Sequence, residues 1–196
     1  MTKLALVPKA PPTSPTVATL TSSSSSEWYT PAWVREYVKK HYGPIDLDPA
    51  AAPGTSLGRR SYDRHDGGLE HPWKGRVYCN PPHARALGET VDPWIEKALE
   101  ELDLGNAELV VMLVPSKTDT IWFHELVLPR AWEVLFFKGR LKFTGRETKN
   151  AATTPHVLLV FRRRRRTGGP RFGTIVPPRT ASARTKRAVT TDDKPP

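Results

Sequence analysis

The chain has 196 residues, of which 38% are hydrophobic, and its formal net charge at pH 7 is +10. This length is typical of a single domain, and the presence of one cysteine, Cys79, excludes an intramolecular disulfide framework. No apolar run approaches the length of a membrane span, and the apolar stretch near the start is too short for a signal peptide. We therefore expect a soluble cytoplasmic protein that does not contact a membrane.

The positive charge is concentrated at the two ends of the chain. Residues 162–196 carry +9 and residues 1–26 carry +2, which leaves −1 for residues 27–161. The first segment is rich in Ser, Thr and Pro, and we expect it to be disordered. The last segment begins with five arginines and is interrupted by Pro and Gly, so we expect a disordered basic tail. The middle segment holds all six tryptophans and is the expected folded domain.

Helical and strand patterns alternate within the expected domain. Thr30 is the predicted N-cap of the first helix, with Pro31 at its first helical position, and Asp92 is the predicted N-cap of the second. The expected elements in chain order are a helix over 31–42, a strand over 45–48, a loop over 53–74, a strand over 75–79, a helix over 91–104, a strand over 107–115, a helix over 118–128, and strands over 132–137 and 156–161. This alternation predicts an α/β fold with a largely parallel sheet. The two late strands lack a long helix between them, which predicts an antiparallel end to the sheet.

Three of the expected strands end in turns that contain proline. The sequences are DLDPAA at 46–51, YCNPP at 78–82 and VVMLVPSK at 110–117. Because ligands of parallel α/β sheets bind beyond the carboxyl ends of the strands, the three turns are candidates for one shared site. The alternative is that proline, which lacks an N–H, only ends each strand. Three such turns at one edge bring the two interpretations close to equal weight.

Eight short pieces of sequence occur together in a characteristic order. They are YTP at 29–31, DLDPAA at 46–51, DGGL at 66–69, WKGRV at 73–77, NPP at 80–82, PWIEKA at 93–98, LVPSKTDTIWFHE at 113–125 and GRLKF at 139–143. This set resembles the phage-type DNA N-6-adenine-methyltransferase (Dam-like) family over residues 27–161. The resemblance implies a Rossmann-like methyltransferase domain that uses S-adenosylmethionine to methylate the N6 amine of adenine at specific sites in DNA. It also implies a bacterial host cell, with the gene carried by a phage or prophage.

The NPP turn is the expected catalytic element. The Asn80 side-chain oxygen and the Pro81 carbonyl can each accept one N–H of the adenine amine, which would direct the nitrogen lone pair at the methyl donor. Pro81 and Pro82 would hold these acceptors stiffly. The resemblance places an aromatic residue after NPP, where it stacks on the rotated target base. This chain has His83 there, and we expect its flat imidazole to stack over a smaller area.

The cofactor-binding residues are expected on two segments and at one acidic position. The small residues that follow Asp48 allow a ligand to approach the backbone, and the resemblance places the methionine part of the cofactor at this stretch. It also implies that the YTP segment closes over the same end. The expected cofactor-binding residues are Tyr29, Thr30, Pro31, Asp48, Pro49, Ala50 and Asp66.

Arginines 162–166 are the expected DNA contacts. A run of exposed cations binds DNA phosphates independently of base sequence. The run consists of Arg162, Arg163, Arg164, Arg165 and Arg166.

Two alternatives to methylation of adenine in DNA stay open. They are methylation of another planar nitrogen, such as a protein glutamine, and DNA binding by a degenerate, non-catalytic site. Two departures from the family pattern keep the last alternative open: His83, and Gly68, which is one glycine more than the DGL motif of the resemblance contains. No histidine or cysteine spacing indicates a metal site.

Overall fold

A computed structural model of the chain describes residues 29–52, 54–82, 90–143, 152 and 154–178. The expected disordered segment 1–26 and the last part of the expected tail, 179–196, lie outside these residues. His83 also lies outside them. No helix in the described parts of the chain is long and apolar enough to cross a membrane.

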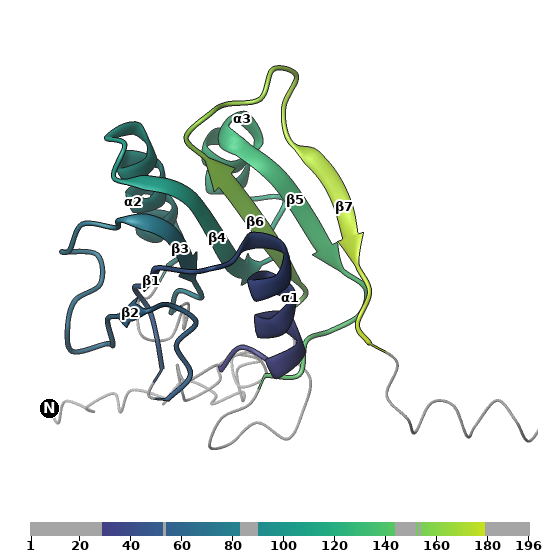
Figure 1. Ribbon diagram of the computed structural model, residues 1–196. Coiled ribbons are helices and arrows are strands. Elements are labelled where there is room, and N and C mark those ends of the chain that lie inside the picture. Colours follow the sequence, from purple (N-terminus) through teal and green to yellow (C-terminus); the bar gives the residue numbers. More distant parts are fainter. Residues whose placement is uncertain (1–28, 53, 83–89, 144–151, 153, 179–196) are drawn as a thin grey trace, which may run out of the picture.

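The described residues form one seven-stranded sheet with the order β2-β1-β3-β4-β6-β5-β7 (Figure 1). The strands are β1 Leu47–Asp48, β2 Arg60–Ser61, β3 Gly75–Cys79, β4 Ala107–Pro115, β5 Ala131–Phe137, β6 His156–Arg162 and β7 Arg171–Ile175. Neighbours pair in parallel except at β6, which runs antiparallel to both β4 and β5. The predicted α/β fold with a mostly parallel sheet is therefore confirmed. The antiparallel strand β6 lies inside the sheet and not at its end, because β5 follows it and β7 pairs in parallel with β5 as the outermost strand.

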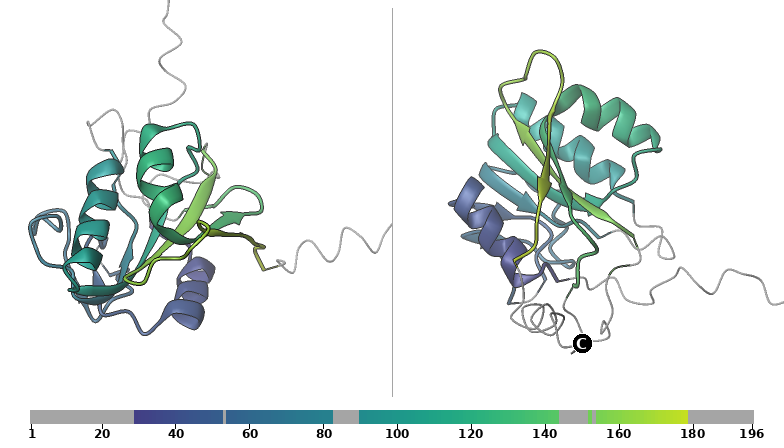
Figure 2. Two further views of the ribbon diagram at one scale, coloured as in Figure 1. Left: turned by 90° about the horizontal axis from the view of Figure 1, so that it is seen from above. Right: turned by 90° about the vertical axis from the view of Figure 1, so that its right-hand side faces the viewer.

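Helices cover both faces of the sheet (Figure 2). They are α1 Ala32–Tyr42 on one face, and α2 Asp92–Asp103 with the π-helical turn η3 Phe123–Val127 and α3 Leu128–Arg130 on the other. Successive side chains of a strand point to opposite faces. Val110, Met112 and Val114 of β4 accordingly pack in the cluster of α2 and η3, whereas the alternate positions pack in the cluster of α1. This two-sided burial explains why β4 is a continuous apolar run.

Two predicted helix caps are wrong. Helix α1 starts after Pro31, whose carbonyl accepts the N–H groups of Val34 and Arg35, and no side chain caps it. The Thr30 hydroxyl instead bonds to the distant Tyr78 hydroxyl. Helix α2 likewise begins at Asp92 itself, without a side-chain cap. At α1, the Thr30 hydroxyl bonds to Tyr78, which is distant in the sequence, and it therefore does not cap the helix.

The structure differs from the expected disordered tail between residues 162 and 178. Strand β6 includes Arg162, and residues 171–175 form β7 in parallel register with β5. The Arg171 guanidinium bonds to the Glu133 carboxylate of β5, and the Phe172 ring stacks on Phe136. These contacts join residues that are far apart in the sequence, so the local composition of residues 162–178 does not predict the strand.

Candidate active site

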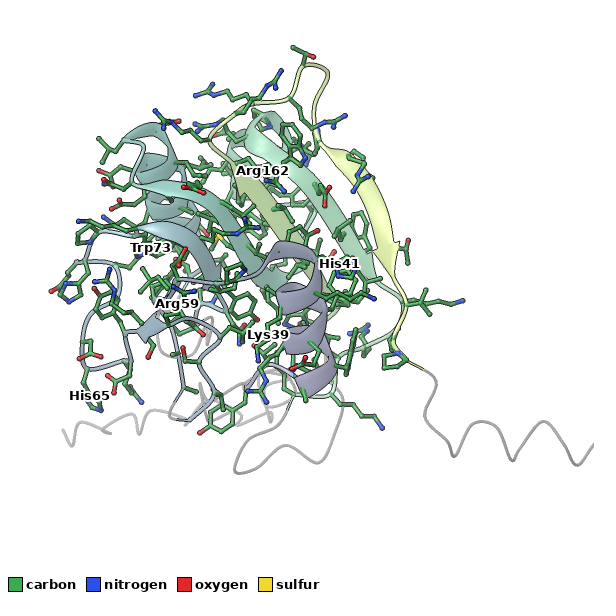
Figure 3. The ribbon with its side chains drawn as sticks, in the orientation of Figure 1. Lys39, His41, Arg59, His65, Trp73 and Arg162 are labelled. Carbon is green, nitrogen blue, oxygen red and sulfur yellow. The ribbon has the colours of Figure 1, made fainter. Side chains whose placement is uncertain are left out.

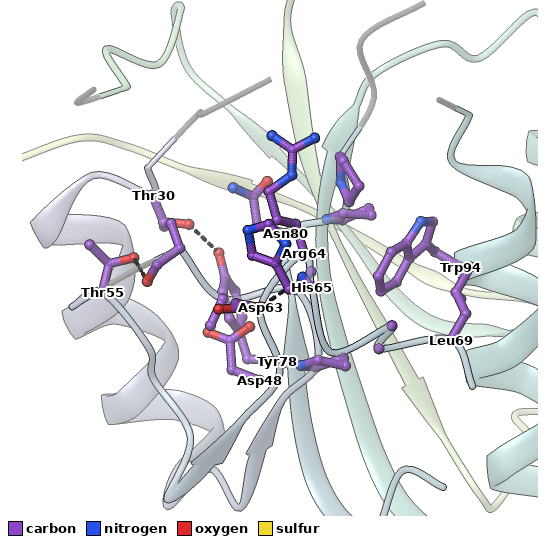
Figure 4. Close-up of a pocket in the computed structure, with 18 of the residues that line it drawn as sticks. Thr30, Asp48, Thr55, Asp63, Arg64, His65, Leu69, Tyr78, Asn80 and Trp94 are labelled. Carbon is purple, nitrogen blue, oxygen red and sulfur yellow. Dashed lines mark hydrogen bonds between the residues drawn. The ribbon is translucent and has the colours of Figure 1, made fainter. Parts of the chain in front are cut away.

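A cavity of about 440 Å³ opens at the carboxyl ends of β1 and β3 (Figure 4). The two strands are parallel neighbours, with Leu47 opposite Val77, so the residues that follow them lie side by side. Eight of the predicted site residues line this cavity: Tyr29, Thr30, Asp48, Pro49, Ala50, Asn80, Pro81 and Pro82. The turn after β4, although at the same edge of the sheet, is not part of the lining that the described residues form.

Asp48 is the buried charge of the cavity. The residue is 3% exposed, and its Oδ2 accepts the Leu57 N–H at 3.2 Å. Its Oδ1 has no hydrogen-bond partner among the described residues. Burial raises the pKa of Asp48 to about 7, although backbone N–H groups at Leu57 and Ala50 act in the opposite direction. When it is ionised, a buried carboxylate with one unpaired oxygen requires a donor or a cation to offset its lost hydration.

Tyr78 lies beside Asp48 and was not predicted as a site residue. Its hydroxyl is 2.8 Å from the Thr30 hydroxyl, and the side chain is 1% exposed. Burial raises the pKa of Tyr78 well above its usual value, and the nearby Asp48 acts in the same direction. Figure 4 shows the hydrogen-bonded pair next to the Asp48 carboxylate. The cavity therefore has a polar end built from β1, β3 and Thr30 in the segment before α1.

The Asn-Pro-Pro turn continues directly from β3 into the cavity wall. Asn80 is partly buried and Pro81 is buried, and both line the cavity together with Pro82. The five residues Gly75–Cys79 pair with β4, so the turn is carried by a strand from the middle of the sheet. The first residue after the turn, His83, belongs to the undescribed stretch 83–89.

The loop after β2 supplies another wall of the cavity, and sequence reasoning largely missed it. Asp63, Arg64, His65, Gly67, Gly68, Leu69 and Glu70 line the cavity, but Asp66 does not. Asp66 Oδ2 accepts the Asp63 N–H at 2.8 Å, while Asp63 Oδ1 accepts the N–H groups of His65 and Asp66. Asp66 thus holds the turn, and Asp63 is the acidic residue that reaches the cavity from the end of β2. Asp63 lies three residues before Asp66 in the sequence, and this second aspartate was the signal that could have pointed to the cavity residue.

Gly68 allows this loop to pack against the turn after β1. A Cβ at this position would lie 1.9 Å from the Pro49 carbonyl oxygen. The Gly68 carbonyl also accepts the indole N–H of the fully buried Trp73 at 2.9 Å. The extra glycine therefore has a structural requirement and is no sign of a degenerate site.

The end of the cavity opposite Asp48 is apolar. Leu69 and Trp94 form this end, across from Thr30, Asp48 and Tyr78 (Figure 4). Trp94 projects from the first turn of α2, and its ring centroid is 6.2 Å from that of Trp73. The cavity thus suits a ligand with a charged polar end and a flat apolar end.

The comparison with known proteins now identifies the family. The chain matches the family model of DNA N-6-adenine-methyltransferase (Dam) over residues 18–192. The chain belongs to this family. The resemblance expected from the ordered motifs is confirmed.

A curated relative gives the same description. The DNA N-6-adenine-methyltransferase of Escherichia phage T1 is 29% identical to this chain over 141 residues. The alignment covers 63% of this chain and 56% of the phage T1 protein. The chain thus spans little more than half of that relative's length.

The predicted DNA-contacting arginines lie away from the cavity. Strand β6 runs antiparallel to β4, so His156 is opposite Pro115 at the carboxyl end of β4, and Arg162 is opposite Leu109 near its amino end. Figure 3 shows Arg162 in the upper part of the molecule and His65 at its lower left. We call the side of the sheet where β4 ends, next to the cavity, the carboxyl edge, and the side where β4 begins the amino edge. The run that starts at Arg162 therefore lies at the amino edge. Across the described residues, no group of three or more His, Cys, Asp or Glu side chains could hold a metal ion.

Proposed function

We propose that this chain transfers a methyl group from S-adenosylmethionine to the N6 amine of adenine at specific sites in DNA. The observation that carries the proposal is the meeting of the Asn-Pro-Pro turn and the buried Asp48 in one cavity at adjacent strand ends. Membership of the DNA N-6-adenine-methyltransferase family supports the reaction and the DNA substrate. The phage T1 relative supports a bacterial host cell as the compartment.

The cavity fits the cofactor in size and in the position of its charges. A volume of about 440 Å³ is within the range of small-ligand sites. The unpaired Asp48 Oδ1 suits the ammonium group of the methionine part, and the small residues Ala50 and Ala51 leave the backbone open beside it. When bound, S-adenosylmethionine supplies a methyl group already activated by a sulfonium.

The remaining parts of the cofactor can be assigned to the loop wall. Asp63 is partly buried and follows β2, whereas Glu70 is exposed, so we assign the sugar hydroxyls to Asp63. Leu69 and Trp94 would cover the purine ring, since aromatic and aliphatic side chains contact flat rings over a large area. Tyr29 and Thr30 would close over the methionine end. Pro31 and Asp66 support the segments that carry these residues.

The chemistry that the protein supplies is the orientation of the adenine amine. The amine is a poor nucleophile because its lone pair is delocalised into the ring. The Asn80 side-chain oxygen and the Pro81 carbonyl would each accept one of its N–H groups and turn the lone pair out of the ring plane. The ring of Pro82 restricts the turn, so the two acceptors are held before the substrate binds. No general base is needed at the moment of transfer.

We assign His83 to the target base. The base has to leave the duplex to reach Asn80, because its amine is otherwise paired inside the helix. An imidazole next to the turn would stack on the extruded ring with less area than a larger aromatic side chain. His83→Tyr should therefore raise kcat/KM for DNA, and a lower value with an intact cofactor affinity would contradict this role.

Methyl transfer to a synthetic duplex tests the proposal. Purified protein, labelled S-adenosylmethionine and a mixture of duplex sequences should yield labelled N6-methyladenine, and Asn80→Ala should reduce transfer by about 100-fold to 1000-fold. Asn106→Ala is the matched control, because Asn106 bonds to Glu101 far from the cavity. Absence of methyl transfer to adenine by the wild-type protein would contradict the proposal. DNA binding without saturable cofactor binding would instead indicate a non-catalytic DNA-binding protein.

Sequencing of modified bases tests the site specificity. DNA from bacterial cells that express the chain should carry N6-methyladenine within one short sequence, whereas cells that express Asn80→Ala should not. Methylation spread over all adenine contexts would contradict site specificity.

A further inference from the structure

The arginine run forms a defined surface at the amino edge of the sheet. This arginine surface consists of Arg162, the last residue of β6, of Arg163, Arg164, Arg165 and Arg166 in the connection between β6 and β7, and of Arg171 at the start of β7. Both ends of the connection are anchored in the sheet, by β6 pairing with β4 and β5 and by β7 pairing with β5. Four arginines thus lie on a connection whose two ends are fixed, and two more lie on the strand residues that flank it, in contrast to a free tail.

An indole ring orders part of this surface. The guanidinium carbons of Arg162 and Arg166 lie 5.7 Å and 5.2 Å from the centroid of the Trp132 ring. Stacking on an aromatic ring orients a guanidinium and leaves its N–H groups available for other partners. The Arg166 Nε also donates to the Gly169 carbonyl. The surface is therefore partly organised before any partner binds.

The acidic residues that face the surface compensate little of its charge. Asp103 of α2 bonds to Arg130 at 2.7 Å and lies 3.8 Å from Arg165. Glu133 contacts Arg171, and its other oxygen accepts the Tyr42 hydroxyl. Arg163, Arg164, Arg165 and Arg166 are all exposed. Several cations thus remain directed at solvent on a small area, an arrangement that suits a polyanion.

The distance between the arginine surface and the cavity indicates which polyanion the surface binds. Strand β4 has nine residues and spans about 30 Å from the amino edge to the carboxyl edge. A straight duplex that presents its target base to Asn80 lies over the carboxyl edge and cannot reach the opposite edge as well. Taking DNA as the substrate from the proposed function, a second stretch of duplex is the partner that this surface fits.

We propose that the arginine surface is a second DNA-binding surface, which binds the phosphates of a duplex segment other than the one being methylated. Arginine binds phosphate oxygens through two parallel N–H groups, and this contact does not depend on base sequence. The surface would hold the enzyme on long DNA and bring two segments together. It would add nothing to methylation of a short duplex that fills only the cavity edge.

Charge substitutions on the connection test the proposal. R163Q/R164Q removes two exposed cations and leaves the stacked pair on Trp132 in place. Its matched control is K39Q/K40Q, which removes two exposed cations from α1. Binding to a duplex of several hundred base pairs should weaken about tenfold at low salt for R163Q/R164Q, and the salt slope should decrease by about 1.8. K39Q/K40Q should change neither value.

A bridging assay measures the second segment directly. A biotinylated duplex with a target site is immobilised, and capture of a second, fluorescent duplex lacking the site is measured without cofactor. The wild-type protein should capture it, R163E/R164E should lose the capture, and both should bind the immobilised duplex alone. Equal capture by R163E/R164E would overturn the proposal. So would tighter wild-type binding to single-stranded RNA or to anionic lipid vesicles than to duplex DNA.

Methylation of a short single-site duplex separates this inference from the proposed function. R163Q/R164Q should methylate such a duplex at the wild-type rate, and a loss equal to that on long DNA would place the arginines at the catalytic contact and overturn the inference. If the wild-type protein transfers no methyl group at all, the proposed function fails, whereas the bridging assay still decides the role of the surface.

Discussion

The two edges of the sheet differ in how they carry charge. The carboxyl edge buries one carboxylate, Asp48, and surrounds it with a cavity, a tyrosine hydroxyl and a stiff Asn-Pro-Pro turn. The amino edge exposes several guanidinium groups and pairs few of them. A buried, incompletely paired charge selects one small ligand, whereas an exposed cluster attracts any nearby polyanion. According to the two proposals, one end of the sheet carries out methyl transfer and the opposite end retains the enzyme on DNA.

Gly68→Ala should give the largest loss of stability among the cavity substitutions. Its Cβ would meet the Pro49 carbonyl oxygen at 1.9 Å, so the loop has to move away from the turn after β1. We expect a loss of about 3 kcal/mol in the free energy of unfolding, measured with urea. Cofactor affinity should fall at least about tenfold. Gly139→Ala is the control, because nothing lies within 4 Å and only its positive φ of 87° opposes the change; that cost is about 1 kcal/mol.

Asp48→Asn should weaken cofactor binding and remove a pH effect on stability. The pKa of Asp48 is raised from 3.8 to about 7, so the folded protein binds more protons than the unfolded chain between these pH values. The wild-type free energy of unfolding should therefore decrease as pH rises from 4 to 7, by at most about 1.4 kcal/mol per pH unit from this group. Asp48→Asn should remove that dependence, as measured by urea unfolding across the range.

The same substitution should change the pH dependence of cofactor affinity. Wild-type affinity for S-adenosylmethionine should rise as pH increases through 7, since only the ionised carboxylate pairs with an ammonium group. The affinity of Asp48→Asn should be about 10-fold to 100-fold lower above pH 7 and nearly independent of pH. A calorimetric titration that finds the same profile in both proteins would remove Asp48 from the cofactor site.

Two buried tyrosines allow the edges to be compared by one chemical change. Tyr42 donates to Glu133 at 2.7 Å near the amino edge, and Tyr78 bonds to Thr30 in the cavity. Tyr42→Phe should lower the free energy of unfolding by about 2 kcal/mol and leave cofactor affinity unchanged. Tyr78→Phe should cost about 1 kcal/mol and also weaken cofactor binding several-fold. Equal effects on cofactor affinity would show that the two edges are not separate.

Asp103→Asn should have the smallest effect on stability. The residue is half-exposed, so its pair with Arg130 contributes about 0.5 kcal/mol. Removing the carboxylate also frees Arg165, so affinity for long duplex DNA should increase about twofold to threefold. Fluorescence anisotropy at several salt concentrations measures this change, and a decrease in affinity would contradict the role of the arginine surface.

Strands and helices that show strong local patterns could be predicted from the sequence. The strand over 107–115 and the one over 75–79 have the predicted bounds, and helix 92–103 lies within the predicted range. Apolar continuity and proline turns define these elements, because both depend only on neighbouring residues. The position of Asn80 beside Asp48 followed from the rule that ligands bind beyond parallel strand ends.

Features that depend on distant contacts could not be predicted. The short strand Arg60–Ser61 exists through backbone bonds to β1, including Arg60 N–H to the Asp46 carbonyl. The choice of Asp63 over Asp66 at the cavity depends on the shape of one turn. The need for Gly68 arises only when its loop packs on Pro49. Strand β7 similarly depends on its pairing with β5 across the chain.

Single-turnover methylation of a short single-site duplex, compared between Asn80→Ala and R163Q/R164Q, tests the separation of the two edges most directly. The account predicts a loss of at least about 100-fold for Asn80→Ala with cofactor affinity preserved. It predicts a rate within about twofold of wild type for R163Q/R164Q, which lacks only contacts to a second duplex. A wild-type rate for Asn80→Ala, or an equal loss in both variants, would contradict it.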